Sequence, residues 1–199
     1  PAMIGLIVLR EPIVALLFGW NAVGPEEVDR IATALLYYGF GLVAFSWIKV
    51  FVAGFYAVQD TKTPVLIASF SMLFNILLNF VLVGPLGYRG LALSTTLAFG
   101  LNAGLLFAFV CRRYGLLMNK VTFVALSKSA AGAMLMAAVV VGVYLGFKLV
   151  FPGDDLFARL VTTAIPIAVG ASAYAYVARV LGLEEIEQFA ALVRRRLGK

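Results

Sequence analysis

The sequence contains no histidine, a single cysteine (Cys111) and few charged residues, and each of these shortages excludes a class of protein. One cysteine cannot build a disulfide framework, and without histidine a zinc or haem site is not expected. Only 13% of the residues are charged, about half the share found in ordinary soluble domains. The chain also lacks a phosphate-binding glycine loop, a pair of catalytic carboxylates and a serine nucleophile elbow. These absences point away from an enzyme and away from a metal centre or an organic cofactor.

Apolar residues, by contrast, make up 63% of the 199 residues, and the mean hydropathy is +1.01. A soluble domain of this size cannot bury so much apolar surface, whereas a bilayer accepts it in helical spans of about 20 residues. The sequence therefore predicts an all-α, polytopic transmembrane helix bundle. Its first residues, PAMIGLIVL, have neither the basic start nor the small-residue cleavage site of a signal peptide. We expect the chain to begin inside a transmembrane helix of a longer protein.

Breaker residues and apolar runs together predict about six spans, the first of them truncated. In the loop at 19–30, the segment Pro25-Glu26-Glu27 suits the first turn of a helix. In the polar turn QDTKT, we expect Thr63 to be the N-cap of the next helix and Pro64 its first residue. The expected helices cover residues 1–9 with a short continuation to 18, then 28–58, 64–83, 90–111, 128–151 and 157–181.

The basic residues indicate which loops face the cytoplasm. Fewer of them lie on the side of the loop at 19–30 than on the opposite side, so the positive-inside rule puts the opposite side and the C-terminus in the cytoplasm. Residues 184–199 end in a triple arginine and carry apolar residues at roughly helical spacing, which predicts an amphipathic tail on anionic membrane lipids. Membrane orientation explains these clusters, so nucleic acid is not an expected partner. On the side of the loop at 19–30 lie Arg10, Arg30, Arg89, Lys148 and Arg159. On the opposite, cytoplasmic side lie Lys62, Arg112, Arg113, Lys120, Lys128, Arg179, Arg194, Arg195, Arg196 and Lys199.

Lys49 is the clearest case of a charged residue deep inside an expected span. It precedes Val58 by nine residues, roughly 14 Å along a helix, which is near the middle of a hydrocarbon layer about 30 Å thick. Helical spacing puts Tyr38, Ser46 and Tyr56 on the same stripe, so the helix has a polar seam. Lys49 is interpreted as a contact for an anionic substrate in a wet cavity, or as the partner of an acid on another helix. A structural ion pair, or a tilted helix with local water, is the alternative.

The next two spans carry amides and hydroxyls: Asn75 and Asn79 one turn apart, then Thr95, Thr96 and Asn102. These groups suit hydrogen bonds between helices. They are also oxygen donors for a hard cation such as sodium, although no carboxylate accompanies them. Small residues at four-residue spacing, Gly100 with Gly104 and Ala138 with Gly142 and Gly146, predict close helix contacts.

Three stretches carry a family resemblance: LREPIVALLF, YYGFGLVAFSWIKVFVAGFYAVQDTKTP and NILLNFVLVGPLGYRGLALSTTLAFGLNAGLL. They closely resemble the C-terminal half of the MurJ/MviN-type lipid II flippases, within the superfamily of multidrug, oligosaccharidyl-lipid and polysaccharide exporters. The resemblance covers about residues 1–115, while 128–181 match only as two further hydrophobic helices. It implies a fourteen-helix transporter, in which residues 1–115 would be the ninth to twelfth helices and the end of the second bundle. Residues 116–183 would add two helices that form a groove for a lipid tail, and 184–199 a basic cytoplasmic tail.

The resemblance also implies a function and a location. Such proteins flip lipid-linked peptidoglycan precursor (lipid II) across the bacterial inner membrane by alternating access, as part of cell wall biogenesis and the maintenance of cell shape. The implied partners are this precursor, anionic membrane lipids and the remaining N-terminal helices of the same protein. The family's substrate-binding arginines lie on earlier helices, which leaves Lys49, with Ser46, Tyr38 and Tyr56, as the substrate-binding candidate in the cavity.

In some members of the family a sodium site uses an asparagine and an aspartate one turn apart, plus a carbonyl and a threonine on the next helix. The matching positions here are Asn75, Asn79, Leu91 and Thr95. Asn79 stands where those members have the acid, and a further ligand would come from a helix outside the chain. Coupling to sodium or to the membrane potential is the implied energy source.

Two other functions remain open at this point. A related polysaccharide or multidrug exporter would share the helical framework. A non-transporting, flippase-like membrane scaffold would use the basic tail to recruit partners. A membrane-embedded transferase should carry acidic catalytic residues, and none stands out in the sequence.

Overall fold

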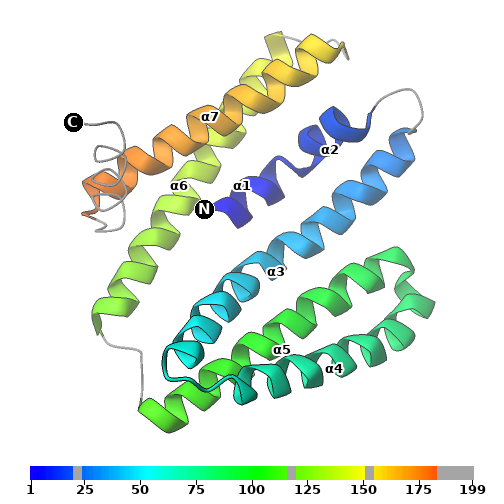
Figure 1. The fold of residues 1–199 in the computed structure, drawn as a ribbon. Helices are drawn as coiled ribbons and strands as arrows, with labels where there is room; N and C mark the ends of the chain where they lie inside the picture. The colour runs from blue at the N-terminus through cyan, green and yellow to red at the C-terminus, as the bar shows by residue number, and fades with distance from the viewer. Residues whose placement is uncertain (20–23, 116–119, 151–154, 183–199) are drawn as a thin grey trace. The chain divides into compact units, whose positions relative to one another are not determined.

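The computed structural model describes residues 1–19, 24–115, 120–150 and 155–182, and within these ranges its regular secondary structure is all helix (Figure 1). The helices are α1 (Ala2–Val8), α2 (Arg10–Phe18), α3 (Pro25–Ala57), α4 (Lys62–Leu86), α5 (Tyr88–Tyr114), α6 (Lys120–Val150) and α7 (Leu156–Val180). Five of them, α3 to α7, are long and apolar enough to cross a membrane. The expected all-α, multi-span architecture is confirmed. The expected amphipathic tail at 184–199 lies outside the described residues.

The expected helix over residues 1–9 and its continuation to 18 are seen as two helices, α1 and α2, separated at Leu9 (φ −97°, ψ 15°). The cause is Pro12, which lacks an N–H and whose ring crowds the carbonyl four residues earlier. That carbonyl belongs to Val8, the last residue of α1. The chain therefore changes direction one residue later and resumes as α2.

α6 begins at Lys120, eight residues before the expected start at Lys128. Lys128 therefore lies within the helix, and its Nζ donates a hydrogen bond of 2.9 Å to the carbonyl of Leu181, just after α7. A basic side chain at a helix C-terminus satisfies an unpaired carbonyl and the negative end of the helix dipole. Lys128 therefore caps the C-terminal end of α7 and does not lie at the start of α6.

The turn between α3 and α4 corrects the expected helix cap. α4 begins at Lys62 and not at Pro64, and Thr63 is not its N-cap. Instead, the carboxylate of Asp60 accepts hydrogen bonds from the backbone N–H of Thr63 (3.1 Å) and from its hydroxyl (2.9 Å). Arg113, at the end of α5, donates to the same carboxylate at 2.7 Å. The N–H and hydroxyl of Thr63, and then Arg113, hold the pKa of Asp60 below its usual value.

The turn between α4 and α5 depends on two glycines. Gly87 has φ +57° and ψ −134°, a conformation that side chains disfavour. At Gly90 an added Cβ would lie 2.3 Å from the carbonyl oxygen of Leu82, so only glycine permits the last turn of α4 to approach the start of α5. This explains the GPLGYRG segment in physical terms.

The chain divides into two compact units. One contains α3, α4 and α5 (residues 25–117), in which α5 packs against both other helices (Figure 1). Its core is formed by Phe55, Ile67 and Leu106. The hydroxyl of Thr96 on α5 also donates to the carbonyl of Tyr37 on α3 at 2.7 Å.

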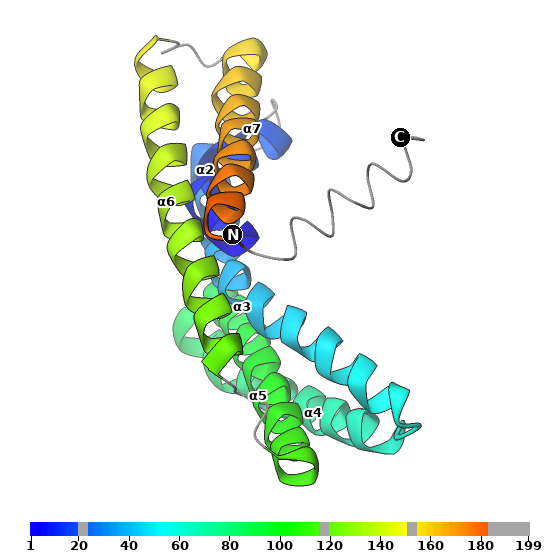
Figure 2. The same cartoon turned by 90° about the vertical axis from the view of Figure 1, so that its left-hand side faces the viewer.

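The other unit contains α1, α2, α6 and α7 (residues 1–24 and 118–199). α6 and α7 run side by side (Figure 2), α1 packs on α6, and α2 packs on α7. Arg159 of α7 donates to the carbonyls of Ala15 (3.2 Å) and Gly19 (2.6 Å) and so closes the C-terminal end of α2. The assignment of residues 1–115 and 116–183 to parts of a larger transporter stays a prediction.

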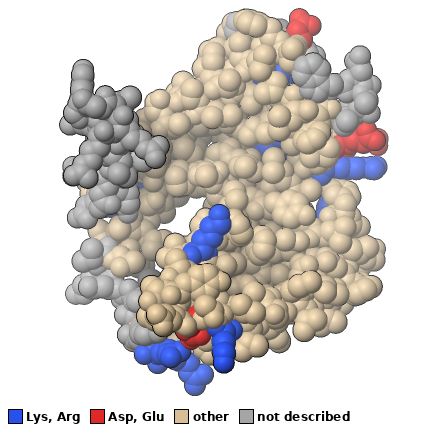
Figure 3. Space-filling model, in the orientation of Figure 1, with Lys and Arg blue, Asp and Glu red and all other residues tan. Residues whose placement is uncertain are grey.

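Most of the surface of the spans is not covered by the chain itself. At most 28% of the most apolar window of each span is buried, and the face in Figure 3 is largely free of charged side chains. Uncovered apolar helices of this length are stable in lipid or against other helices, and not in water. The chain is therefore a multi-pass membrane protein.

Candidate functional site: an apolar pocket and two polar clusters

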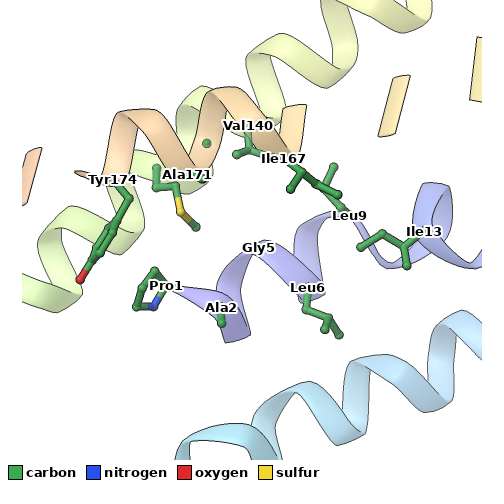
Figure 4. Close-up of a pocket in the computed structure, with 12 residues that line it drawn as sticks. Pro1, Ala2, Gly5, Leu6, Leu9, Ile13, Val140, Ile167, Ala171 and Tyr174 are labelled. Carbon is green, nitrogen blue, oxygen red and sulfur yellow. The ribbon is translucent and has the colours of Figure 1, made fainter. Parts of the chain in front are cut away.

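An apolar pocket of about 390 Å³ lies within the unit of α1, α2, α6 and α7. Its walls come from four helices, as Figure 4 shows, with Tyr174 and Pro1 toward one end and Ile13 toward the other. The volume is in the range of pockets that hold small ligands or part of a larger one. The lining residues are Pro1, Ala2, Gly5, Leu6, Leu9, Ile13, Met136, Val140, Ile167, Gly170, Ala171 and Tyr174.

The one polar side chain in this lining is Tyr174, and its hydroxyl is already engaged. It lies 3.1 Å from the hydroxyl of Ser129 on α6, within hydrogen-bond distance. The wall therefore offers an occupant aliphatic and aromatic surface without a directed polar contact. Such a wall suits a flexible hydrocarbon chain and does not suit a charged or sugar group.

Close packing of α6 and α7 shapes the pocket at Gly170. This glycine is buried, and an added Cβ would lie 2.4 Å from Cγ2 of Val140 on α6. Val140 belongs to a buried cluster with Leu9 and Met136. The predicted close contacts at Gly100, Gly104, Gly142 and Gly146 are wrong within the described chain, because an added Cβ at each meets no atom within 4 Å.

The expected polar seam lies on α3. Tyr38, Ser46, Lys49 and Tyr56 are all exposed in this chain, and their spacing places them within about 80° of one another around the helix. The hydroxyl of Ser46 donates to the carbonyl of Leu42 at 2.8 Å, a bond within the helix. Lys49 Nζ lies 4.6 Å from the centre of the Phe45 ring.

Lys49 forms no ion pair with any residue in the part of the chain that the structure describes. Its partner, Phe45, offers the attraction of an aromatic face to a cation, which is weaker than an ion pair with a carboxylate. The ammonium group thus keeps capacity to bind an anion. Whether the seam faces a cavity stays a prediction.

The second polar cluster joins α4 to α5 and contains all four expected cation-site residues. Asn79 Nδ2 donates to Asn75 Oδ1 at 3.2 Å, and the Thr95 hydroxyl donates to the carbonyl of Leu91 at 3.0 Å. Sequence reasoning missed Ser94, which is fully buried and connects the two helices. Its hydroxyl contacts Asn79 Oδ1 and lies 2.9 Å from the same Leu91 carbonyl. Its position one turn after Leu91 could have indicated from the sequence that Ser94 belongs to this cluster.

The described residues contain no group of three or more histidine, cysteine or acidic side chains that could hold a metal ion. Asn102, further along α5, has a buried Oδ1 without a hydrogen-bond partner in the described chain. The cluster is therefore built from neutral amides, hydroxyls and one carbonyl.

The model of the family described as "Lipid II flippase MurJ" matches residues 1–181. A probable lipid II flippase MurJ of Vibrio cholerae is 39% identical over 140 residues, which is 69% of this chain and 26% of that protein. One from Rhizobium tropici is 29% identical over 99% of this chain and 36% of its own length. A solved structure described as lipid II flippase MurJ in an inward closed conformation has the same fold, with a TM-score of 0.68 and 24% identity over 91% of this chain and 36% of that one.

Proposed function

We propose that this chain, which belongs to the MurJ family of lipid II flippases, is part of a transporter that moves lipid-linked peptidoglycan precursor across the bacterial inner membrane. The family consists of transporters and not of enzymes. The chain spans between 20% and 36% of the length of the curated relatives that it matches. In this proposal it acts together with the remaining helices of the same protein.

The observation that carries the proposal is the apolar pocket lined by α1, α2, α6 and α7. Lipid II joins a long hydrocarbon tail to a diphosphate and a sugar-peptide headgroup, so a flippase must provide a separate surface for each part. The pocket provides an apolar surface whose single polar side chain, Tyr174, is already engaged with Ser129. We assign to it a segment of the lipid tail, which close van der Waals packing would hold there, because a tail that already lies in the bilayer gains no transfer energy from water.

The headgroup requires a wet, cationic path, and Lys49 is the candidate for it on this chain. Its ammonium group is exposed on α3 and contacts only an aromatic ring among the described residues. A diphosphate would gain from that charge at mid-membrane depth, where an unpaired lysine is costly. Movement then follows from a shift between two bundle arrangements, each with its own contacts to the headgroup.

The orientation in the proposal follows the basic residues. The end of α5 carries Arg112 and Arg113, and the end of α7 carries Arg179, beside which Lys128 of α6 donates to the carbonyl of Leu181. The positive-inside rule places these ends in the cytoplasm, together with the C-terminus. Anionic lipids of the inner leaflet would bind the same surface.

A pair of matched tryptophan variants tests the proposal. Ile167 lines the pocket, whereas Val169 lies about 200° further round α7 and does not line it. We expect Ile167→Trp to fill the pocket and to reduce the amount of lipid II that reaches the outer leaflet. Val169→Trp adds the same ring to the same helix and should transport normally.

The measurement uses a bacterial strain in which the full-length protein is the sole flippase, with lipid II quantified separately on the two leaflets. Equal protein abundance in the two variants excludes a folding defect. Normal transport by Ile167→Trp would show that transport does not require the pocket. Normal cell-wall synthesis without the protein, with no build-up of lipid II on the inner leaflet, would favour the exporter or scaffold function.

A further inference from the structure

The polar cluster between α4 and α5 is held together by donor–acceptor pairs, and this arrangement decides which ligands it can accept. The central contact is between the amides of Asn75 and Asn79 on successive turns of α4. Ser94 of α5 contacts Asn79, and Ser94 and Thr95 both direct their hydroxyls to the carbonyl of Leu91. Both helices are long apolar spans, so the cluster is a polar island in an apolar environment.

The hydrogen-bond inventory favours one orientation of the two amides. A hydroxyl carries a single proton, so Ser94 cannot donate fully to both Asn79 and Leu91. Asn75 Nδ2, in addition, is buried and has no partner in the described chain. Turning both amides by 180° keeps every heavy-atom contact and frees the Ser94 proton for Leu91. It also puts an acceptor oxygen, in place of an N–H₂ donor, at the buried position of Asn75 that lacks a partner in the described chain. Asn75 then donates to Asn79, Asn79 to Ser94, and Ser94 to the carbonyl of Leu91.

In either orientation, one amide donates a hydrogen bond to the other. A cation site cannot contain such a contact, because its ligands must all be acceptor oxygens. Oxygens that bind a cation must converge on one point, whereas here an N–H₂ group of one asparagine faces the oxygen of its neighbour. The carbonyl of Leu91 already accepts from two hydroxyls. No carboxylate belongs to the cluster to offset the cost of bringing a charge into an apolar span. The residues present therefore do not fit a sodium ion.

We propose that α4 and α5 are joined here without a cation, and that Asn79 is the residue that makes this region independent of sodium. The amide of Asn79 supplies both a donor and an acceptor, so it connects Asn75 to Ser94 directly. A carboxylate at the same position could only accept. The Asn75 amide and the Ser94 hydroxyl can donate to it, but its negative charge in an apolar span would still lack a counter-charge, and it would thus create a demand for a cation.

The test measures thermal unfolding of the purified full-length protein in NaCl and in KCl at equal ionic strength. We expect the unfolding temperature of the wild type to be the same in both salts at every concentration. In Asn79→Asp we expect it to rise with sodium in a saturable manner and not with potassium, by at least about 2 °C at saturation, because a ligand that binds only the folded state stabilises it. Asn102→Asp places a carboxylate elsewhere on α5 and should show no sodium-specific rise.

Two results would overturn the proposal. One is a saturable, sodium-specific rise in the wild type, which requires no variant to fold. The other is a response of Asn79→Asp no larger than that of Asn102→Asp. If Asn79→Asp does not accumulate, Asn75→Asp introduces the carboxylate on the other side of the same contact, with the same expected and contradicting results. Because the readout is stability and not transport, its failure is separate from a failure of the flippase proposal.

Discussion

Replacing Gly170 by alanine is expected to force α6 and α7 apart. The new Cβ would lie 2.4 Å from Cγ2 of Val140, whereas carbon atoms normally approach no closer than about 3.5 Å. The new Cβ and Cγ2 of Val140 would thus be about 1 Å too close. Val140 is only 2% exposed, and its branched side chain has one strongly preferred rotamer in a helix, so it cannot turn away. The helix backbones must therefore move.

Overpacking of this kind typically costs about 1–3 kcal/mol, and we expect Gly170→Ala to destabilise the protein by that amount. Val140→Ala removes the methyl group that the new Cβ meets, at the cost of a small cavity. The double variant should therefore be more stable than the sum of the two single effects predicts, with a coupling energy of at least about 1 kcal/mol. That coupling distinguishes a direct clash from a general loss of helix packing.

The assay is equilibrium unfolding of the full-length protein in detergent micelles, with Gly142→Ala as the control. Gly142 lies on α6, and an added Cβ there meets no atom within 4 Å. The same chemical change should then leave the protein at least as stable, with a gain of up to about 1 kcal/mol from the higher helix propensity of alanine. The reasoning is refuted if Gly170→Ala is as stable as Gly142→Ala, or if Val140→Ala fails to rescue it.

Two further predictions concern charged groups. Lys49→Ala should lower lipid II transport far more than it lowers protein abundance. The control, Lys62→Ala at the start of α4, should leave transport unchanged. Normal precursor turnover in Lys49→Ala would exclude Lys49 from the headgroup path. Because Thr63 and Arg113 hold the pKa of Asp60 below its ordinary value of about 3.9, its contribution to stability should be complete at neutral pH and lost as the pH falls through the lowered value. The difference in unfolding temperature between the wild type and Asp60→Asn should therefore shrink in acid, and a pH-independent difference would contradict this account.

Several parts of the structure were predictable residue by residue. Pro12 interrupts the first helix, and Gly87 permits the turn before α5, because each acts through its own backbone. The cap of α4 was assigned to the wrong residue: Asp60, three positions before Thr63, supplies the carboxylate. The local pattern allows either residue to cap. The choice also depends on Arg113, which is distant in sequence and reaches Asp60 only in the fold.

Helix contacts were less predictable. The four-residue spacing of Gly100 and Gly104 suggested a close contact, yet both are open in the described chain, while Gly170 packs tightly against Val140 without a partner glycine in a motif. Hydrophobicity cannot distinguish these cases, because lipid tails are as apolar as a neighbouring helix. The fit of one helix surface to another decides between them.

By itself, the sequence determined that the chain crosses a membrane several times, where most of its helices run, and which residues are polar within them. Each of these properties follows from one segment alone, since a span must satisfy its own backbone in lipid. Only the tertiary structure decided that α1, α2, α6 and α7 together line an apolar pocket. It also decided that the amides of α4 bond to each other and to Ser94, because both features require side chains from separate helices to meet at a particular distance and orientation.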